Sequence, residues 1–359
     1  MKTLRSLTLL ALPFLLAACG GGSKPAASSA GASNEEKKLN IFCWAEYIPQ
    51  GVIDEFSKET GIQVSVENYA SNEELIGKLV AGGGKYDLIQ PSEYAIEALV
   101  KADQLQPLNQ QALTNLGNLA PEFRGMPFDP GNKYSVPFMA GFVGICVNTE
   151  KIKTPVTGFQ DVFTPANKGR IVVLDDAREI SSWALGQAGL GINDVTPETL
   201  AKIKPILEKW LPLVKVYDSD SPKTALKNGD VDIGVVWSGE AAILYNDNKK
   251  FGFVLPKEGA HLFVDNMAIP KTATHPQNAH LFINYLLRPE VSKKISDAFP
   301  YYNPNSAARS LLSADQLANP ASYPPAQEVS RMQTFRDLGE QAAAIDELVT
   351  KVKAGGKGK

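Results

Sequence analysis

Short apolar segments with the character of β-strands alternate along this chain with segments of helical spacing, and this alternation constrains the fold more than any other feature. Strands that alternate with helices form mostly parallel sheets covered by helices. A similar alternation resumes between residues 169 and 287. The chain therefore predicts an α/β fold. In its N-terminal part the predicted strands are 39–44, 63–69 and 87–90, and the predicted helices are 51–60, 71–81 and 93–101.

A long apolar run at residues 134–148, broken by Gly141 and Gly144, separates the two sets of strands and helices. Such a run predicts the place where the chain crosses between two lobes. The chain of 359 residues is too long for one typical core, which also favours two domains. The tail from 307 to 359 has helical character broken by Pro320, Pro324 and Pro325.

The first residues have the pattern of an export signal. Lys2 and Arg5 precede an apolar run at residues 7–18, which is too short to span a bilayer as a helix. Cys19 directly after Leu-Ala-Ala resembles the lipidation site of bacterial lipoproteins. We therefore expect a signal peptide at 1–18, a lipid on Cys19 and a Gly/Ser/Ala-rich tether over 19–37. The alternative is an ordinary signal peptide with an incidental cysteine.

The net charge excludes one class of function, and the cysteine content leaves one structural question open. The formal net charge of −3 argues against nucleic-acid binding, which needs a basic surface. After Cys19 only Cys43 and Cys146 remain. An exported protein permits a disulfide between them, but both lie in strand-like runs and two buried thiols are equally compatible with the sequence.

Residues for catalysis or cofactor binding are poorly represented. The three histidines, at 261, 275 and 280, have no metal-ligand spacing, and we expect them at surface turns. The Gly82-Gly83-Gly84-Lys85 run lacks the spacing and the hydroxyl residue of a phosphate loop. We predict no catalytic residue, no metal site and no cofactor.

Aromatic and acidic residues recur together at the ends of predicted strands. In open α/β sheets ligands bind beyond the carboxyl ends of the strands. Aromatic faces attract cations, and carboxylates form charge-assisted hydrogen bonds with ammonium groups. The pattern therefore suits a slim polycation with alternating methylene and ammonium segments. The clusters are 44–47, 92–94, 175–179, Trp237, 263–265 and 301–302.

At these residues the chain resembles the spermidine/putrescine-binding proteins of bacterial polyamine ABC importers. The resemblance runs from about residue 39 to 355, and the Asp-Asp-Ala-Arg-Glu string at 175–179 is among its more distinctive parts. The other matching strings lie at 44–49, 86–88, 91–92, 256–259, 287–289 and 304–305.

The resemblance implies a two-lobed periplasmic-binding-protein type II fold with a hinge of crossing strands. Each lobe would hold a mixed, mostly parallel sheet flanked by helices. Residues 38–142 and 265–311 would form lobe 1, and residues 143–264 and 312–359 would form lobe 2.

The resemblance also implies roles for individual residues in an interlobe cleft. Lobe 1 would supply the first wall, and lobe 2 the carboxylates for the amine nitrogens. Asp265 would meet an ammonium near the hinge. The implied ligand contacts are Trp44, Glu46, Tyr47, Ser92 and Tyr94 on the first wall, Asp176 and Glu179 opposite, Trp237 and Phe263 along the methylenes, and Asp265 and Tyr301.

As a family member the chain would be a monomeric binding protein without enzymatic activity. It would capture spermidine or putrescine and deliver it to the membrane permease of an ABC transporter. It would work in the periplasm or cell envelope, anchored to the membrane through Cys19.

The chain departs from the family pattern at three positions. Ala45 stands where a hydroxyl residue is usual, and Phe263 where some members have Trp. Phe335 stands where a ligand-contacting Gln is expected, although Gln333 is two residues away. These changes leave the choice of polyamine open.

Two other functions remain as alternatives. Adjacent tyrosines, Tyr301 and Tyr302, suggest a ferric-ion binding protein of the same fold. Asp176 and Glu179 suggest a carboxylate-based glycoside hydrolase, although two acids three residues apart would hardly flank a glycosidic bond from opposite sides.

Overall fold

A nine-stranded mixed sheet organises the protein. The computed structural model describes residues 35–82 and 84–355. The strand order is β2-β1-β3-β9-β4-β7-β5-β6, and β8 pairs with β4 beside this path. The strands are β1 (Lys38–Trp44), β2 (Gln63–Tyr69), β3 (Leu88–Ile89), β4 (Ser135–Asn148), β5 (Ile171–Val173), β6 (Val214–Tyr217), β7 (Ile233–Trp237), β8 (Phe251–Val254) and β9 (Leu262–Ala268).

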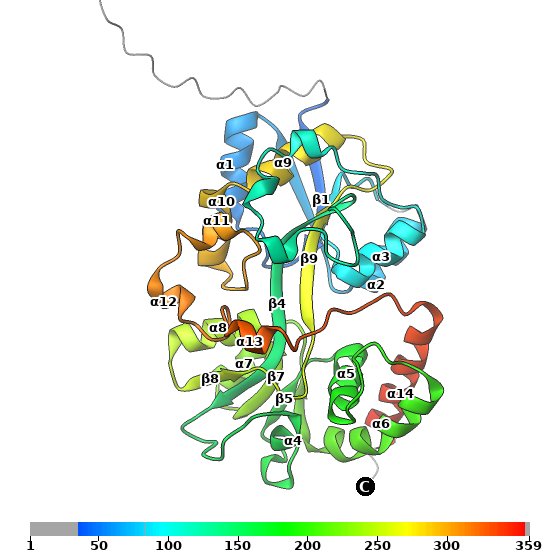
Figure 1. Cartoon of the computed structure of the whole chain (residues 1–359), viewed down its shortest axis with the longest axis vertical. Helices are drawn as coiled ribbons and strands as arrows, with labels where there is room; N and C mark the ends of the chain where they lie inside the picture. The colour runs from blue at the N-terminus through cyan, green and yellow to red at the C-terminus, as the bar shows by residue number, and fades with distance from the viewer. Residues whose placement is uncertain (1–34, 83, 356–359) are drawn as a thin grey trace, which may run out of the picture. The chain divides into compact units, whose positions relative to one another are not determined.

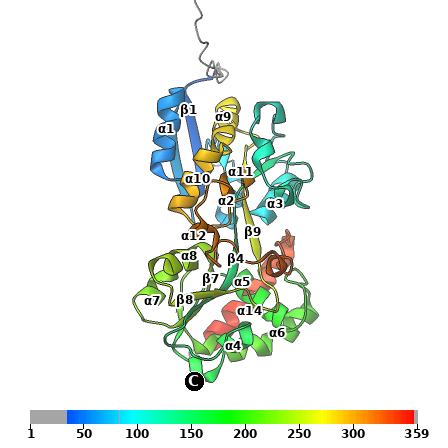
Figure 2. The same ribbon diagram turned by 60° about the vertical axis from the view of Figure 1, so that its left-hand side comes forward.

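Helices cover the sheet in two groups (Figures 1 and 2). The first half contains β1–β3 with α1 (Gln50–Thr60), α2 (Asn72–Val80), α3 (Glu93–Lys101), α9 (Pro276–Leu286), α10 (Pro289–Ala298) and α11 (Ser306–Arg309). The second half contains β5–β8 with α4 (Phe159–Val162), α5 (Ala177–Gln187), α6 (Pro197–Trp210), α7 (Lys223–Lys227), α8 (Ser238–Asp247) and α14 (Ala342–Gly355). Short helices α12 (Ala314–Leu317) and α13 (Ala326–Val329) lie in the segment before α14.

The fold differs from the expected mostly parallel sheet at its centre. β1 pairs in parallel with β2 and β3, and β5 pairs in parallel with β6 and β7. The central pairs β3–β9, β4–β9, β4–β7 and β4–β8 are antiparallel. β8 ends at Val254 and β9 begins at Leu262, and this short connection contains no helix, whereas parallel pairing needs a longer crossover that is usually a helix.

The predicted crossing at residues 134–148 is a single strand, β4. Its first part pairs with β9, from Ser135 against Ala268 to Phe142 against Leu262. Its second part pairs with β7 and β8 of the second half. Figure 1 shows β4 and β9 running side by side between the two groups of helices. The exact lobe boundaries remain a prediction.

Each half has its own buried core. In the first half, Phe56 and Phe282 pack edge to face at 4.8 Å inside a cluster that includes Leu39 and Ile41. In the second half, Trp210 stacks on Phe163 at 4.4 Å. Leu and Ile side chains buried to this degree each contribute about 1.5–3 kcal/mol.

Capping residues in the sequence determine where two of the helices begin. Ser71 caps α2 by accepting a hydrogen bond from the Glu74 amide, as the capping pattern predicts. α5 begins at Ala177 because Asp176 caps it. In the described part of the predicted helical tail, three short helices (α11, α12 and α13) and a 3-10 helix at Gly339–Gln341 precede the longer α14.

The predicted signal peptide, Cys19 and most of the tether lie outside the described residues. Within the described part of the chain, no helix has the length and apolar character needed to cross a bilayer.

Candidate functional site

Asp265 on β9 is the centre of the candidate site. It is 3% exposed, and both of its carboxylate oxygens accept a hydrogen bond. Tyr47, just after β1, donates its hydroxyl to Oδ2 at 2.9 Å. Ser92, just after β3, donates its hydroxyl to Oδ1 at 2.6 Å. Residues that follow the ends of β1 and β3 thus converge on a buried carboxylate in the middle of β9, and not at a strand end as the sequence predicted.

Burial raises the pKa of Asp265 to about 7. The hydroxyls of Ser92 and Tyr47 oppose this rise, and the nearby Glu93 carboxylate adds to it. The group is therefore poised between its neutral and charged forms near neutral pH. A cation placed beside it would favour the charged form.

Four aromatic side chains form a continuous series of ring contacts around Asp265, which we call the aromatic row. Tyr47 lies 5.7 Å from Tyr301, Tyr301 lies 5.9 Å from Phe263, and Phe263 lies 5.5 Å from Trp237. Trp237 comes from the end of β7 in the second half, and its indole N–H donates to the Ser219 carbonyl at 2.9 Å. The row joins residues of both halves, and aromatic faces of this kind attract cations.

Two glycines allow the aromatic row to lie close to the backbone. A Cβ on Gly141 of β4 would stand 2.3 Å from the ring of Phe263. A Cβ on Gly239 at the start of α8 would stand 2.3 Å from the ring of Tyr301. Neither position can hold a side chain without displacing an aromatic ring.

The first-wall residues Trp44 and Tyr94 lie beside this centre. Asn72 donates to Ser92 at 3.0 Å and to the Tyr94 hydroxyl at 3.1 Å, which connects Tyr94 to the Asp265 network. Trp44 packs on Tyr69 at 4.6 Å, and its buried indole N–H has no partner within the described chain. Glu46 is exposed and has a left-handed backbone, with φ of 54°.

The two predicted acids of the second half have structural partners. Asp176 accepts hydrogen bonds from the amides of Arg178 and Glu179 at the start of α5. Burial and the nearby Glu179 raise its pKa to about 6. Glu179 is 1% exposed, and its Oε1 lies 2.6 Å from Nδ1 of His261.

The expectation that His261 and His280 occupy surface turns is wrong. His261 is 4% exposed and His280 is 7% exposed. His261 lies between two carboxylates, because its Nε2 is 2.8 Å from Oε1 of Glu93 at the start of α3. His261 directly precedes β9, whose residues from Phe263 to Ala268 are buried, and this position places the imidazole in the interior.

Phe335 covers this histidine. The two rings stack at 3.8 Å, and the Arg178 guanidinium lies 4.2 Å from the Phe335 ring. The Phe335 amide donates to Glu93 at 3.1 Å. Sequence reasoning missed His261 and Glu93 as a unit, because the strand and helix that carry them meet only in the folded chain.

The two tyrosines of the ferric-ion alternative have different surroundings. The Tyr302 hydroxyl accepts from Arg309 at 3.0 Å and its ring packs on Phe123, whereas Tyr301 belongs to the aromatic row. No His/Cys/Asp/Glu group within residues 35–82 and 84–355 has the arrangement of a metal site.

Cys43 and Cys146 are buried free thiols, and burial raises the pKa of each to about 12.

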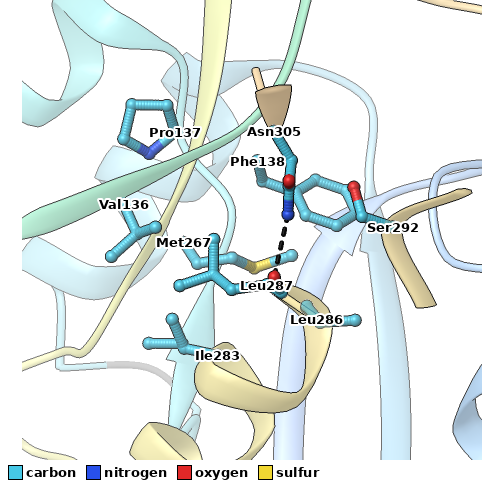
Figure 3. Close-up of a pocket in the computed structure, with 9 residues that line it drawn as sticks. All are labelled: Val136, Pro137, Phe138, Met267, Ile283, Leu286, Leu287, Ser292 and Asn305. Atoms are coloured by element: carbon cyan, nitrogen blue, oxygen red, sulfur yellow. Dashed lines mark hydrogen bonds between the residues drawn. The ribbon is translucent and has the colours of Figure 1, made fainter. Parts of the chain in front are cut away.

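A separate pocket lies in the first half, away from these residues (Figure 3). Its lining is mostly apolar and comes from β4, β9, α9 and α10, with Asn305 donating to the Leu287 carbonyl at 2.8 Å. It contains none of the predicted ligand contacts.

Comparison with known proteins places the chain in one family. Residues 51–324 match the family of bacterial extracellular solute-binding proteins. The spermidine/putrescine-binding periplasmic protein of Salmonella typhimurium is 37% identical over 326 residues, which cover 90% of this chain and 93% of that protein. The putrescine-binding periplasmic protein PotF of Escherichia coli is 34% identical over 345 residues, covering 89% of this chain and 92% of that protein.

A solved structure confirms the predicted type II α/β fold. The spermidine/putrescine ABC transporter substrate-binding protein PotD of Streptococcus pneumoniae superposes with a TM-score of 0.80 at 32% identity. The match covers 89% of this chain and 100% of that chain.

Proposed function

Because the chain belongs to the bacterial extracellular solute-binding proteins, we propose that it is the polyamine-binding component of an ABC uptake transporter, with spermidine or putrescine as its ligand. The names of the relatives support this proposal, and so does the chemistry of the site. A polyamine alternates ammonium groups with methylene segments, and the site places a carboxylate beside aromatic rings.

The observation that carries the proposal is the buried Asp265 carboxylate inside the aromatic row. Isolated buried charges are costly, so a carboxylate whose hydrogen-bond donors within the described chain are two hydroxyls is suited to receive a cation. An ammonium would bind Asp265, and the methylenes on either side would lie against Phe263, Tyr301 and Trp237. Binding at this position would draw on residues of both halves.

Asp265→Asn tests this assignment. Asparagine keeps the size of the side chain but removes the charge, so we expect polyamine affinity to fall by about 10- to 100-fold, the range for a charge-assisted hydrogen bond. Isothermal titration calorimetry with spermidine and putrescine measures the loss. Asp315→Asn, at an exposed position on α12, removes the same charge elsewhere and serves as the matched control.

Equal affinity of Asp265→Asn and wild type for both amines would remove Asp265 from the site. Failure of the wild-type protein to bind either amine would reject the polyamine function itself.

The cellular assignments follow from the same proposal. The relatives named as periplasmic support a periplasmic or cell-envelope location. We further propose that a lipid on Cys19 anchors the protein to the membrane, that the protein acts as a monomer, and that it passes its ligand to a permease without catalysing a reaction. Cys19→Ser should move the protein from the membrane fraction to the soluble fraction and abolish labelling with a fatty-acid probe.

The proposed lobes, 38–142 with 265–311 and 143–264 with 312–359, would close around the amine. β4 and β9 are the strands that run between the two halves, so bending at these strands would bring Trp237 and Asp176 toward Tyr47 and Ser92. Closure would shield the ammonium groups from water and strengthen their interaction with the carboxylates.

A further inference from the structure

His261 is a buried basic side chain placed between the two halves at one end of the candidate site. Its Nε2 faces Glu93 of α3 at 2.8 Å, and its Nδ1 faces Glu179 of α5 at 2.6 Å. All three side chains are less than 5% exposed. The imidazole therefore joins a helix start of the first half to a helix of the second half.

With Glu93 and Glu179 both ionised, both ring nitrogens of His261 donate. Carboxylates accept hydrogen bonds, and a neutral imidazole has only one N–H, so two carboxylate contacts call for the imidazolium form. Burial by itself would lower the pKa of His261, but Glu179 and Glu93 together raise it to about 9. The residue is thus a resident cation at neutral pH.

This cation occupies one of the two carboxylate oxygens that a ligand could use at Glu179. If Glu179 held an amine nitrogen, the amine would need its oxygens, yet Oε1 is bonded to His261. Oε2 is buried and has no partner within the described chain. Phe335 covers the imidazole at 3.8 Å and Arg178 lies on Phe335 at 4.2 Å, so this end also contains a second positive charge.

We propose that His261 determines specificity: its imidazolium takes the place of one ligand ammonium at Glu179, so that the site accepts a diamine in preference to a triamine. The inference rests on the proposed polyamine function. A third ammonium at this end would lie beside the positive charges of His261 and Arg178 and would share Glu179 with His261, which makes its burial costly. A diamine needs no partner at that end.

Competitive selectivity between putrescine and spermidine tests the proposal. Calorimetric titrations of the full protein give the ratio of the two dissociation constants. We expect the wild type to bind putrescine about tenfold more tightly than spermidine, and His261→Leu to shift the ratio at least tenfold toward spermidine, since one ammonium–carboxylate contact contributes about 1.5–3 kcal/mol.

His261→Leu leaves two buried acids without a cation and is expected to be less stable. The double variant His261→Leu/Glu93→Gln removes one of these acids, keeps Glu179 free for the ligand, and should show the same shift. His275→Leu is the matched control, because His275 also pairs with a buried carboxylate, Asp87 at 3.0 Å, but lies outside the site.

An unchanged putrescine-to-spermidine ratio in the double variant would overturn the proposal, as would a wild type that prefers spermidine. Absence of binding of both amines to the wild type would instead reject the proposed function, so the two failures are distinguishable.

Discussion

The buried carboxylate of Asp265 couples ligand binding to protonation. Its pKa of about 7 lies well above the ordinary value of 3.8 because of burial, so part of the population holds a proton near neutrality. A bound ammonium stabilises the ionised form and lowers this pKa. The ligand-free and ligand-bound proteins therefore hold different numbers of protons.

Two consequences follow for binding measured against pH. Polyamine association should release about half a proton per complex at pH 7, and affinity should fall as the pH drops from about 8 to 5.5, because protonated Asp265 must first ionise. Calorimetry in two buffers of different ionisation enthalpy measures the released proton. Asp176, with a pKa of about 6, contributes at the lower end, so Asp265→Asn should reduce the dependence without abolishing it.

A flat affinity profile across this range would mean that Asp265 is already ionised in the free protein. In that case the charge is present before the ligand arrives.

Trp237 tests the aromatic row without altering charge. Its ring lies 5.5 Å from Phe263 and is fixed by the indole hydrogen bond to Ser219. Trp237→Ala should weaken polyamine binding about tenfold, within the range of cation–π contacts, and Trp237→Phe should lose less. Fluorescence or calorimetric titration measures both. Equal affinity of all three proteins would assign Trp237 to packing alone.

Residue patterns in the sequence predicted the residues that lie around Asp265 but not the pairing of Glu93 with His261. Asp265, Ser92, Tyr47, Phe263, Trp237 and Tyr301 were predicted from acids and aromatics at strand ends, and the structure brings them together. Whether each of them contacts the ligand remains a prediction. Glu93 and His261 were not predicted as partners, because 168 residues separate them and no local pattern encodes their pairing.

At the level of elements, one imidazole links α3, α5 and the start of β9. α3 and α5 begin close to the site, since their N-cap residues are the predicted site residues Ser92 and Asp176. Acids in the first turn of a helix are favoured by its dipole, which explains why Glu93 and Glu179 tolerate burial beside a shared cation.

This link predicts a specific dependence of stability on pH. The folded-state pKa of His261, about 9, is higher than its ordinary value of 6.5. Its contribution is therefore fully present below about pH 6.5 and is lost as the pH rises through about 9. Thermal unfolding between pH 6.5 and 9.5 should show a falling Tm for the wild type and a flatter profile for His261→Leu.

Parallel profiles for the two proteins would indicate that other groups, and not His261, govern stability in this range. His275→Leu provides the comparison for loss of a histidine outside the site.

The elements themselves were largely predictable, whereas the pairing of the central strands was not. Residues 39–44 and 51–60 gave β1 and α1 because apolar spacing and turn residues act locally. The antiparallel pairing of β4 with β9 depends on segments more than 100 residues apart, which sequence periodicity does not describe.

For the whole molecule, a ligand that joins both halves should stabilise the folded chain as a unit. Stabilisation by a ligand bound only to the folded state reaches about 2.7 kcal/mol at 100 times its dissociation constant. We expect putrescine to raise Tm progressively with concentration, and Asp265→Asn to need higher concentrations for the same rise. Differential scanning fluorimetry measures both, and cadaverine and spermine extend the comparison.

If Asp315→Asn and the wild type show the same rise of Tm with putrescine concentration, the change seen in Asp265→Asn depends on the site and not on net charge. Identical curves for Asp265→Asn and wild type would contradict the binding geometry.

The tight contacts at Gly141 and Gly239 couple substitutions at positions that are distant in sequence. Because an added Cβ at either glycine would stand 2.3 Å from the ring of Phe263 or Tyr301, enlarging the glycine requires that ring to shift or to become smaller. Substitutions at each glycine and at the ring it faces should therefore be non-additive in their effects on stability.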